Sequence, residues 1–283
     1  MSGLRVYSGV MAGFACLGVY LFAAAPPPLP EATQVAQSGC TRPVAQLFDS
    51  VNAINQAARD VYTRDIVGPG LKAGLKFDEE WQHPTVEAGP LPALFLRLTA
   101  AKLEAMPIRL GLYLGSDAPI NKSNLFSDAQ LQQFVSVKAS RTPVFAAEEG
   151  IGQIAMYPDI AAAQPCVSCH NDHADSPKVD WKLNDVMGAT TWLYPRADVP
   201  AEEYLEAVEA TFHAVALAYG DYLDKAQGFA TPVRFGDAWP VVGQAQLVLP
   251  DRAHFLTRVR KEAAAALAVG LLPDQNGDAP CTE

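Results

Sequence analysis

The chain has 283 residues, of which 49% are hydrophobic and 18% are charged, and its net charge is −10. This composition is typical of a folded core and excludes a largely disordered chain, and the length allows one sizeable domain with an extension or two small domains. An acidic chain without a Lys/Arg cluster argues against nucleic acid as a partner.

Residues 6–25 form an uncharged apolar run that is just long enough to span a bilayer. Arg5 is the only charged side chain before it, which predicts a cytoplasmic N-terminus. We therefore predict that residues 1–25 are a membrane anchor, which places the protein in the inner membrane with the rest of the chain in the periplasm. The alternative is a cleaved signal peptide and a soluble periplasmic protein, although Pro26 would be a poor start after cleavage.

Residues 26–41 are rich in proline, which predicts an extended linker. From about Pro43, apolar residues recur at three- and four-residue steps, which indicates an amphipathic helix that Gly68, Pro69 and Gly70 should end. A second helix is predicted from Ala93 to about Ala105, after a proline-rich start.

The middle of the chain predicts strands. A strand at Arg109–Leu114 and a short helix at Asp128–Val135 precede a hairpin, and a last strand follows a cysteine-bearing loop. The hairpin strands are Thr142–Ala147 and Ile151–Met156, and the last strand is Val186–Leu193. This order predicts an α+β domain over residues 42–199, with an antiparallel sheet and helices on one face.

Residues 200–283 are predicted to form a helical C-terminal extension. Its first helix runs from Pro200 to about Lys225, and its apolar seam consists of Leu205, Val208, Phe212, Val215, Tyr219 and Tyr222. Packing of this seam on its own sheet is favoured over pairing with another helix in a dimer, because the run is short. Residues 227–250 look irregular, and a last helix is expected from Asp251 to Val269.

The most informative motif is Cys166-Val167-Ser168-Cys169-His170, which reads C-x-x-C-H. This sequence is typical of c-type haem attachment, in which two thiols bond to one porphyrin and the adjacent histidine binds the iron. It predicts one covalent haem c with thioethers at Cys166 and Cys169 and His170 as the proximal iron ligand. The alternatives are a zinc site completed by His173 and a thioredoxin-like redox pair, although no βαβ pattern surrounds the motif.

Of the other cysteines, Cys16 lies in the apolar run, while Cys40 and Cys281 lie near the ends of the exported part. An oxidising compartment permits a disulfide between Cys40 and Cys281, but the sequence does not show that they meet.

Three stretches resemble the family of exported c-type haem sensor domains called domain of unknown function 3365, which has a PAS-like fold. They are residues 166–189 with the haem motif, Gly89-Pro90-Leu91-Pro92-Ala93 with its helix, and Leu112-Tyr113-Leu114-Gly115-Ser116 with Pro119, Asn121 and Asn124. The resemblance spans roughly Ala53 to Trp192. It implies a PAS-like pocket around one covalent haem and a role in sensing redox state or a small ligand.

The chain departs from that family in two respects. No catalytic motif, such as that of a kinase or cyclase, follows Trp192, so the chain would signal through a protein partner or would not signal at all. The first helix, at residues 53–60, also lacks the cysteine that serves some family members as the sixth iron ligand. The distal ligand is therefore unknown, with His83 and Met156 as candidates, and an empty site would suit a gas such as NO or CO.

The sequence thus predicts a membrane-anchored haem-based redox or small-ligand sensor. The alternative is a one-electron carrier, that is, a c-type cytochrome that serves a partner on the same membrane. A peroxidase-like enzyme is a third alternative, but the sequence assembles no distal acid–base constellation for it, so no enzyme activity is predicted. Arg97, Lys178 and Lys182 are candidate partners of the haem propionates.

Overall fold

The computed structural model describes residues 40–243 and 246–271, which contain both helices and small sheets. The helices are α2 (Val44–Val61), the π-helix η1 (Tyr62–Val67), α3 (Gly68–Lys72), α4 (Pro92–Glu104), the 3-10 helix η2 (Lys122–Asn124), α5 (Asp128–Ser140), α6 (Gln164–Asp172), α7 (Ala201–Gln227) and α8 (Arg252–Leu271). The strands are β1 (Thr41–Pro43), β2 (Phe77–Asp78), β3 (Gly89–Pro90), β4 (Gly111–Gly115), β5 (Val144–Glu148), β6 (Gly152–Ile160), β7 (Val186–Tyr194), β8 (Asp198–Pro200), β9 (Val233–Gly236), β10 (Val241–Gly243) and β11 (Gln246–Pro250). The predicted α+β class is confirmed.

The main sheet has the order β4-β7-β6-β5, and all its neighbouring strands are antiparallel. The predicted hairpin is confirmed as β5 and β6, and the predicted strands before and after it are β4 and β7. In the register of β6 and β7, Ala155 lies opposite Trp192 and Met156 lies opposite Thr191. Because neighbouring residues of a strand point to opposite faces, these two pairs belong to different faces of the sheet.

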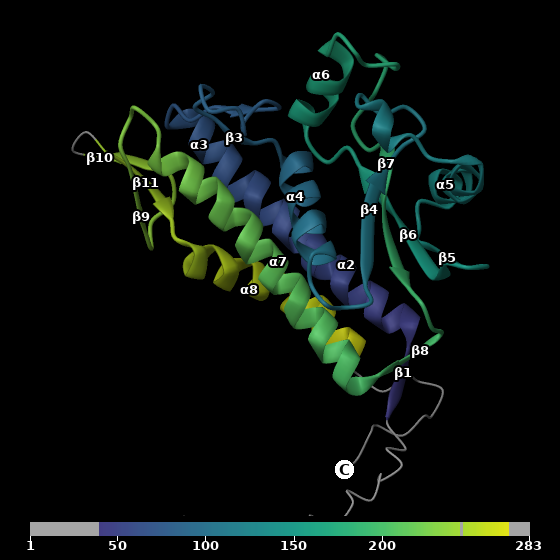
Figure 1. Cartoon of the computed structure of the whole chain (residues 1–283). Helices are drawn as coiled ribbons and strands as arrows, with labels where there is room; N and C mark the ends of the chain where they lie inside the picture. Colours follow the sequence, from purple (N-terminus) through teal and green to yellow (C-terminus); the bar gives the residue numbers. More distant parts are fainter. Residues whose placement is uncertain (1–39, 244–245, 272–283) are drawn as a thin grey trace, which may run out of the picture. The chain divides into compact units, whose positions relative to one another are not determined.

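Helices cover both faces of this sheet, so the prediction of helices on one face only was wrong. On one face, Ala155 and Trp192 pack against α2 and α7. On the other, Met156 packs against Phe134 and Val137 of α5. Figure 1 shows α5 on the opposite side of the sheet from α2, α4 and α7. The sequence hid this arrangement because the exposed side of α5 carries apolar residues such as Val135 as well.

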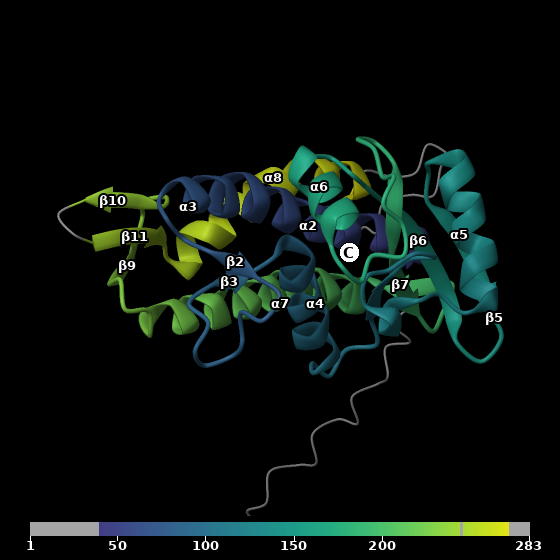
Figure 2. The same cartoon turned by 90° about the horizontal axis from the view of Figure 1, so that it is seen from above.

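The largest core lies between helices rather than on the sheet. Tyr62 stacks on Phe95 of α4, with ring centroids 4.3 Å apart, and Tyr219 of α7 stacks on Phe255 of α8 at 4.0 Å. The buried residues of the predicted seam therefore pack mainly against α2, α4 and α8, whereas Leu205 is 59% exposed. Figure 2 shows α2, α7 and α8 running side by side. The predicted extension shares its core with the helices that precede it, and the described residues from Thr41 onward belong to one compact unit.

Polar side chains join α2 to the sheet at three positions along the helix. The Tyr157 hydroxyl donates to Asp49 (2.6 Å), the Trp192 indole N–H donates to Asn52 (3.2 Å), and Arg59 pairs with Asp159 (2.9 Å). Asp49, Asn52 and Arg59 follow helical spacing, so they share one side of α2. These contacts fix the orientation of α2 against β6 and β7.

Two local predictions were wrong. Gly68 and Pro69 do not end the first helix, because the π-helix η1 intervenes and α3 then continues to Lys72. A π turn widens the backbone, which accommodates a proline whose ring would clash with the preceding turn of a regular helix. Residues 227–250 are also less irregular than expected, since they contain the small sheet β10-β11-β9.

The helices of the second half agree with their predictions, as α7 and α8 begin and end within two residues of the expected limits. The predicted membrane anchor lies in residues 1–25, outside the part that the structure describes. Among residues 40–243 and 246–271, no helix has the length and apolar character that crossing a membrane requires.

The packing of Met156 gives a stability prediction. Its side chain is fully buried beneath α5, so Met156→Ala should lower the free energy of unfolding by about 2–5 kcal/mol, because it leaves a cavity. Chemical denaturation measures this difference. Leu205→Ala is the matched control and should change it by less than about 0.5 kcal/mol, because Leu205 is largely exposed. Equal effects of the two substitutions would contradict the packing.

Candidate functional site

The C-x-x-C-H motif lies on the short helix α6 rather than in the loop expected from the sequence. Pro165 occupies the first turn of α6, where a proline loses no hydrogen bond and its fixed φ suits a helix. The Cys166 N–H donates to the Ala163 carbonyl (3.0 Å), and the helix ends where the His173 N–H donates to the Cys169 carbonyl (3.0 Å). The helical spacing places Cys166, Cys169 and His170 on neighbouring positions of one side of α6.

Both thiols of the motif are free, and both reach the surface to different degrees. Cys166 is half-buried and Cys169 is exposed. Burial, followed by the nearby charge of Glu79, raises the pKa of the Cys169 thiol. A raised pKa keeps the thiol protonated at neutral pH, whereas the reactive cysteine of a thioredoxin-like pair has a lowered pKa.

His170 carries an unpartnered nitrogen. Its ring is half-buried, and its Nδ1 is buried without a hydrogen-bond partner among the described residues. Burial, followed by the proximity of His173, lowers the pKa of the imidazole. The neutral ring is the form that binds a metal ion, and a buried nitrogen without a partner costs about 1–3 kcal/mol.

Glu79 lies between α6 and α4. Its carboxylate is 3.2 Å from Nε2 of His173, and its charge also acts on Arg97 of α4. The Arg97 guanidinium is half-buried, forms no hydrogen bond or ion pair with another described residue, and has a pKa lowered by burial. Figures 1 and 2 both show α6 close to α4. The helix α4 thus carries, close to α6, a cation that forms no ion pair with the described residues.

Trp181 is the largest side chain packed against α6. Its ring is buried with Val167 and Ala161, and it meets the His170 ring edge-on, with centroids 6.4 Å apart. Asn171 holds the Trp181 backbone by two hydrogen bonds: its Nδ2 donates to the carbonyl (3.0 Å) and its Oδ1 accepts from the N–H (2.9 Å). These contacts tie the segment after α6 to the helix.

The two distal candidates lie in different surroundings. His83 is exposed in the turn between β2 and β3, with its Nδ1 2.9 Å from the Thr85 hydroxyl. Met156 lies in the core beneath α5. Neither forms a hydrogen bond, ion pair or ring contact with the described residues of α6. Met187 is the thioether that packs against the cluster of Val167 and Trp181.

The contact of Glu79 with His173 could not be predicted from the sequence. Glu79 is distant from the motif in the chain and lies in a segment without a recognisable pattern. The position of Met187 beside Trp181 was not predicted either, although Met187 follows the motif closely.

Among the described residues, no group of three or more His, Cys, Asp or Glu side chains is arranged to hold a metal ion. The four residues of the zinc alternative, Cys166, Cys169, His170 and His173, therefore form no such group. Cys40 is disulfide-bonded, and Cys281, the partner that an oxidising compartment would permit, lies outside the described residues.

The Asn171 hydrogen bonds predict how α6 holds its neighbouring segment. Asn171→Ala removes both bonds and leaves the Trp181 backbone without them, so it should lower the free energy of unfolding by about 1–3 kcal/mol. Asn171→Asp keeps the oxygen that accepts from the Trp181 N–H and should cost less. Chemical denaturation ranks the two variants, and the reverse order would contradict this role.

One comparison with known proteins gives a match. The model of the Tll0287-like family (Tll0287) matches residues 112–195, less than a third of the chain. No curated protein and no solved structure matches. The matched region begins within β4, ends just after β7, and includes all of α6 with its C-x-x-C-H motif.

Proposed function

We propose that this chain is an exported, membrane-anchored monohaem c-type protein that acts as a haem-based redox or small-ligand sensor. The observation that carries the proposal is α6 itself. It presents two free thiols one helical turn apart, next to a half-buried histidine with an unpartnered nitrogen. When bound, a haem would supply a redox-active iron, with Cys166 and Cys169 as thioether positions and His170 as the proximal ligand.

Arg97 supports the proposal from the neighbouring helix. A half-buried guanidinium that forms no hydrogen bond or ion pair with the described residues is costly, and a carboxylate is its natural partner. Haem propionates are carboxylates, so Arg97 would serve as their anchor. Lys178 is a weaker candidate for this role, because it already pairs with Asp180 and lies over the Trp181 ring. Lys182 remains a third candidate.

The sheet arrangement is consistent with the PAS-like part of the proposal. Its antiparallel strands β4, β7, β6 and β5 are flanked by helices, and α6 directly follows the end of β6. That end is joined to α2, because Asp159 of β6 pairs with Arg59 of α2. Asp159 also accepts a hydrogen bond from Thr190 of β7 (3.1 Å). A shift of α6 would therefore move a strand end that is tied to α2, which begins next to the predicted linker to the membrane.

This connection favours a sensor over the alternative, a one-electron carrier in a membrane electron-transfer chain. A carrier needs only a stable haem site and a docking partner, whereas a sensor needs a path by which a change at the haem reaches another element. The Arg59–Asp159 pair, which joins the strand before α6 to α2, would be part of such a path. The partner of a sensor would be a signalling protein, and that of a carrier a redox protein.

The sixth iron ligand separates gas sensing from pure redox chemistry. His83 lies four residues after Glu79, whose carboxylate reaches His173 at the end of α6, so His83 belongs to a segment close to the motif. Met156 would have to leave a filled core to reach the iron. His83 is therefore the preferred distal candidate, and without a sixth ligand the site would take a small gas such as NO or CO.

The test begins with protein matured in a host that exports and attaches haem. The full chain should show a c-type visible spectrum that survives denaturation, because the thioethers are covalent. Cys166→Ser and Cys169→Ser should each weaken covalent attachment, while Ser168→Ala, in the same helix, should leave it intact. A colourless, correctly folded wild-type protein would overturn the proposal.

A second measurement addresses the distal side. The reduced spectrum is recorded before and after addition of CO, for the wild type, His83→Ala and Met156→Leu. If His83 is the sixth ligand, CO should shift the spectrum of His83→Ala much more readily than that of the wild type, and Met156→Leu should resemble the wild type. An identical CO response of all three proteins would remove His83 from the site.

A further inference from the structure

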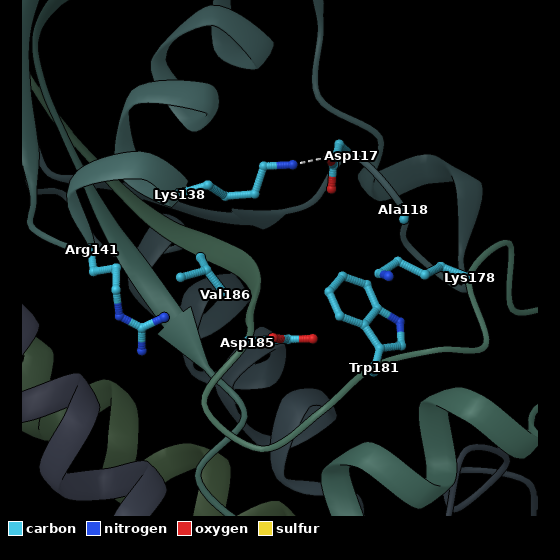
Figure 3. A pocket seen from close by; sticks show the side chains of 8 residues that line it. All are labelled: Asp117, Ala118, Lys138, Arg141, Lys178, Trp181, Asp185 and Val186. Atoms are coloured by element: carbon cyan, nitrogen blue, oxygen red, sulfur yellow. Dashed lines mark hydrogen bonds and ion pairs between the residues drawn. The ribbon is translucent and has the colours of Figure 1, made fainter.

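A solvent-open cavity of about 300 Å³ lies beside Trp181, on the side of the sheet covered by α5. Figure 3 shows Arg141 on one side of it, Trp181 and Lys178 on the other, and Val186 and Asp185 between them. The volume suits a small molecule. Buried Trp181 and Val186 give the cavity an apolar wall, while its rim is charged.

Most of the charges around the cavity are already paired. Lys138 pairs with Asp117, and Lys178 pairs with Asp180 and lies 4.7 Å from the centre of the Trp181 ring. The Arg141 guanidinium, by contrast, forms no hydrogen bond or ion pair within the part of the chain that the structure describes.

Asp185 is the second charged group at the cavity that can bind a ligand. One of its carboxylate oxygens accepts from the Lys182 backbone N–H (2.9 Å), which leaves the other oxygen available. The cavity thus has one cation without an ion pair among the described residues, Arg141, and one carboxylate with a free oxygen, Asp185.

The backbone of Arg141 determines where its side chain lies relative to the cavity. Arg141 ends α5 with a φ of 59°, in the left-handed region, and its N–H donates to the Val137 carbonyl (2.8 Å). Glycine or asparagine is the usual residue at such a helix end, because a side chain is strained there. This conformation fixes the point at which the exposed Arg141 side chain leaves the end of α5, next to the cavity.

We propose that this cavity binds a free amino acid or a similar small zwitterion. The guanidinium of Arg141 would hold the carboxylate, for which its planar pair of donors is suited. Asp185 would hold the ammonium group, and an aliphatic side chain would lie against Trp181 and Val186. The presence of Asp185 disfavours a dicarboxylate, whose second negative charge it would repel.

Trp181 connects this cavity to α6, since the same ring meets His170 and the same backbone is held by Asn171. An occupant that packs against Trp181 would therefore alter the surroundings of the C-x-x-C-H motif. This regulatory consequence rests on the proposed haem function, whereas the binding itself does not.

The experiment is isothermal titration calorimetry on the full chain purified from a haem-attaching host, with glycine, L-alanine and L-valine as probes. Isovalerate, which keeps only the carboxylate, and isobutylamine, which keeps only the amine, are the matched analogues of L-valine. At least one amino acid should bind, and isovalerate and isobutylamine should bind at least tenfold more weakly than L-valine if L-valine is the best probe. Absence of binding by all three amino acids at millimolar concentration would overturn the proposal.

The variants separate binding from folding. Arg141→Gly should weaken binding at least tenfold while its thermal midpoint stays equal or rises, because glycine relieves the strained backbone. Asp185→Asn keeps the acceptor for the Lys182 N–H and should also weaken binding. Arg234→Gln, which removes an exposed cation on β9, is the control and should bind as the wild type does. If Arg141→Gly binds the amino acid as tightly as the wild type does, the amino acid does not bind in this cavity.

The outcome for haem is read separately from the visible spectrum of the same sample. Amino-acid binding without covalent haem would retain this inference and refute the proposed function. Covalent haem without amino-acid binding would support the proposed function and refute this inference. If both hold, addition of the bound amino acid should shift the haem absorption bands of the wild type and leave those of Arg141→Gly unchanged.

Discussion

The packing of Trp181 against α6 is the contact on which the candidate site depends. Asn171 fixes the Trp181 backbone from within α6, and the indole covers Val167 and meets the edge of His170. A nine-residue helix is too short to be stable by itself, so it needs such tertiary contacts to keep its side chains in place. With Trp181 in position, the two thiols and the imidazole share one side of a fixed helix.

The same ring also forms the wall of the cavity at the end of α5, which gives one residue two environments. On one side it meets the proposed haem ligand, and on the other it meets the space between Arg141 and Asp185. Packed side chains pass on displacements because protein interiors leave little free volume. Trp181 is thus the residue through which ligand binding in the cavity would affect the surroundings of His170, and the reverse.

Much of the fold was predictable because its signals are local. Alternating and helical apolar patterns determine α4, β4, the β5–β6 hairpin, β7, α7 and α8 closely. The continuation of α2 past Pro69 was not predictable, since a π turn leaves no distinctive sequence pattern. The sheet of β9, β10 and β11 was also missed, because its short strands are stabilised by contacts with each other and with α8 rather than by a strong alternation.

The motif residues Cys166, Cys169 and His170 could be named from the sequence, since their chemistry depends on spacing along the chain. Glu79 and Arg97 could be placed beside them only by the fold, because long-range packing of α4 and the β2–β3 segment brings them there. Arg141 could not be singled out either, as its left-handed backbone and its missing ion pair are properties of the folded chain.

The central claim is that α6 carries a covalent haem, and the most direct test is the intact mass of the full chain purified from a haem-attaching host. We predict a mass increase of one haem in the wild type and none in the double variant in which both Cys166 and Cys169 are replaced by alanine. A wild-type mass without haem, from a host that attaches haem to a control cytochrome, would contradict it.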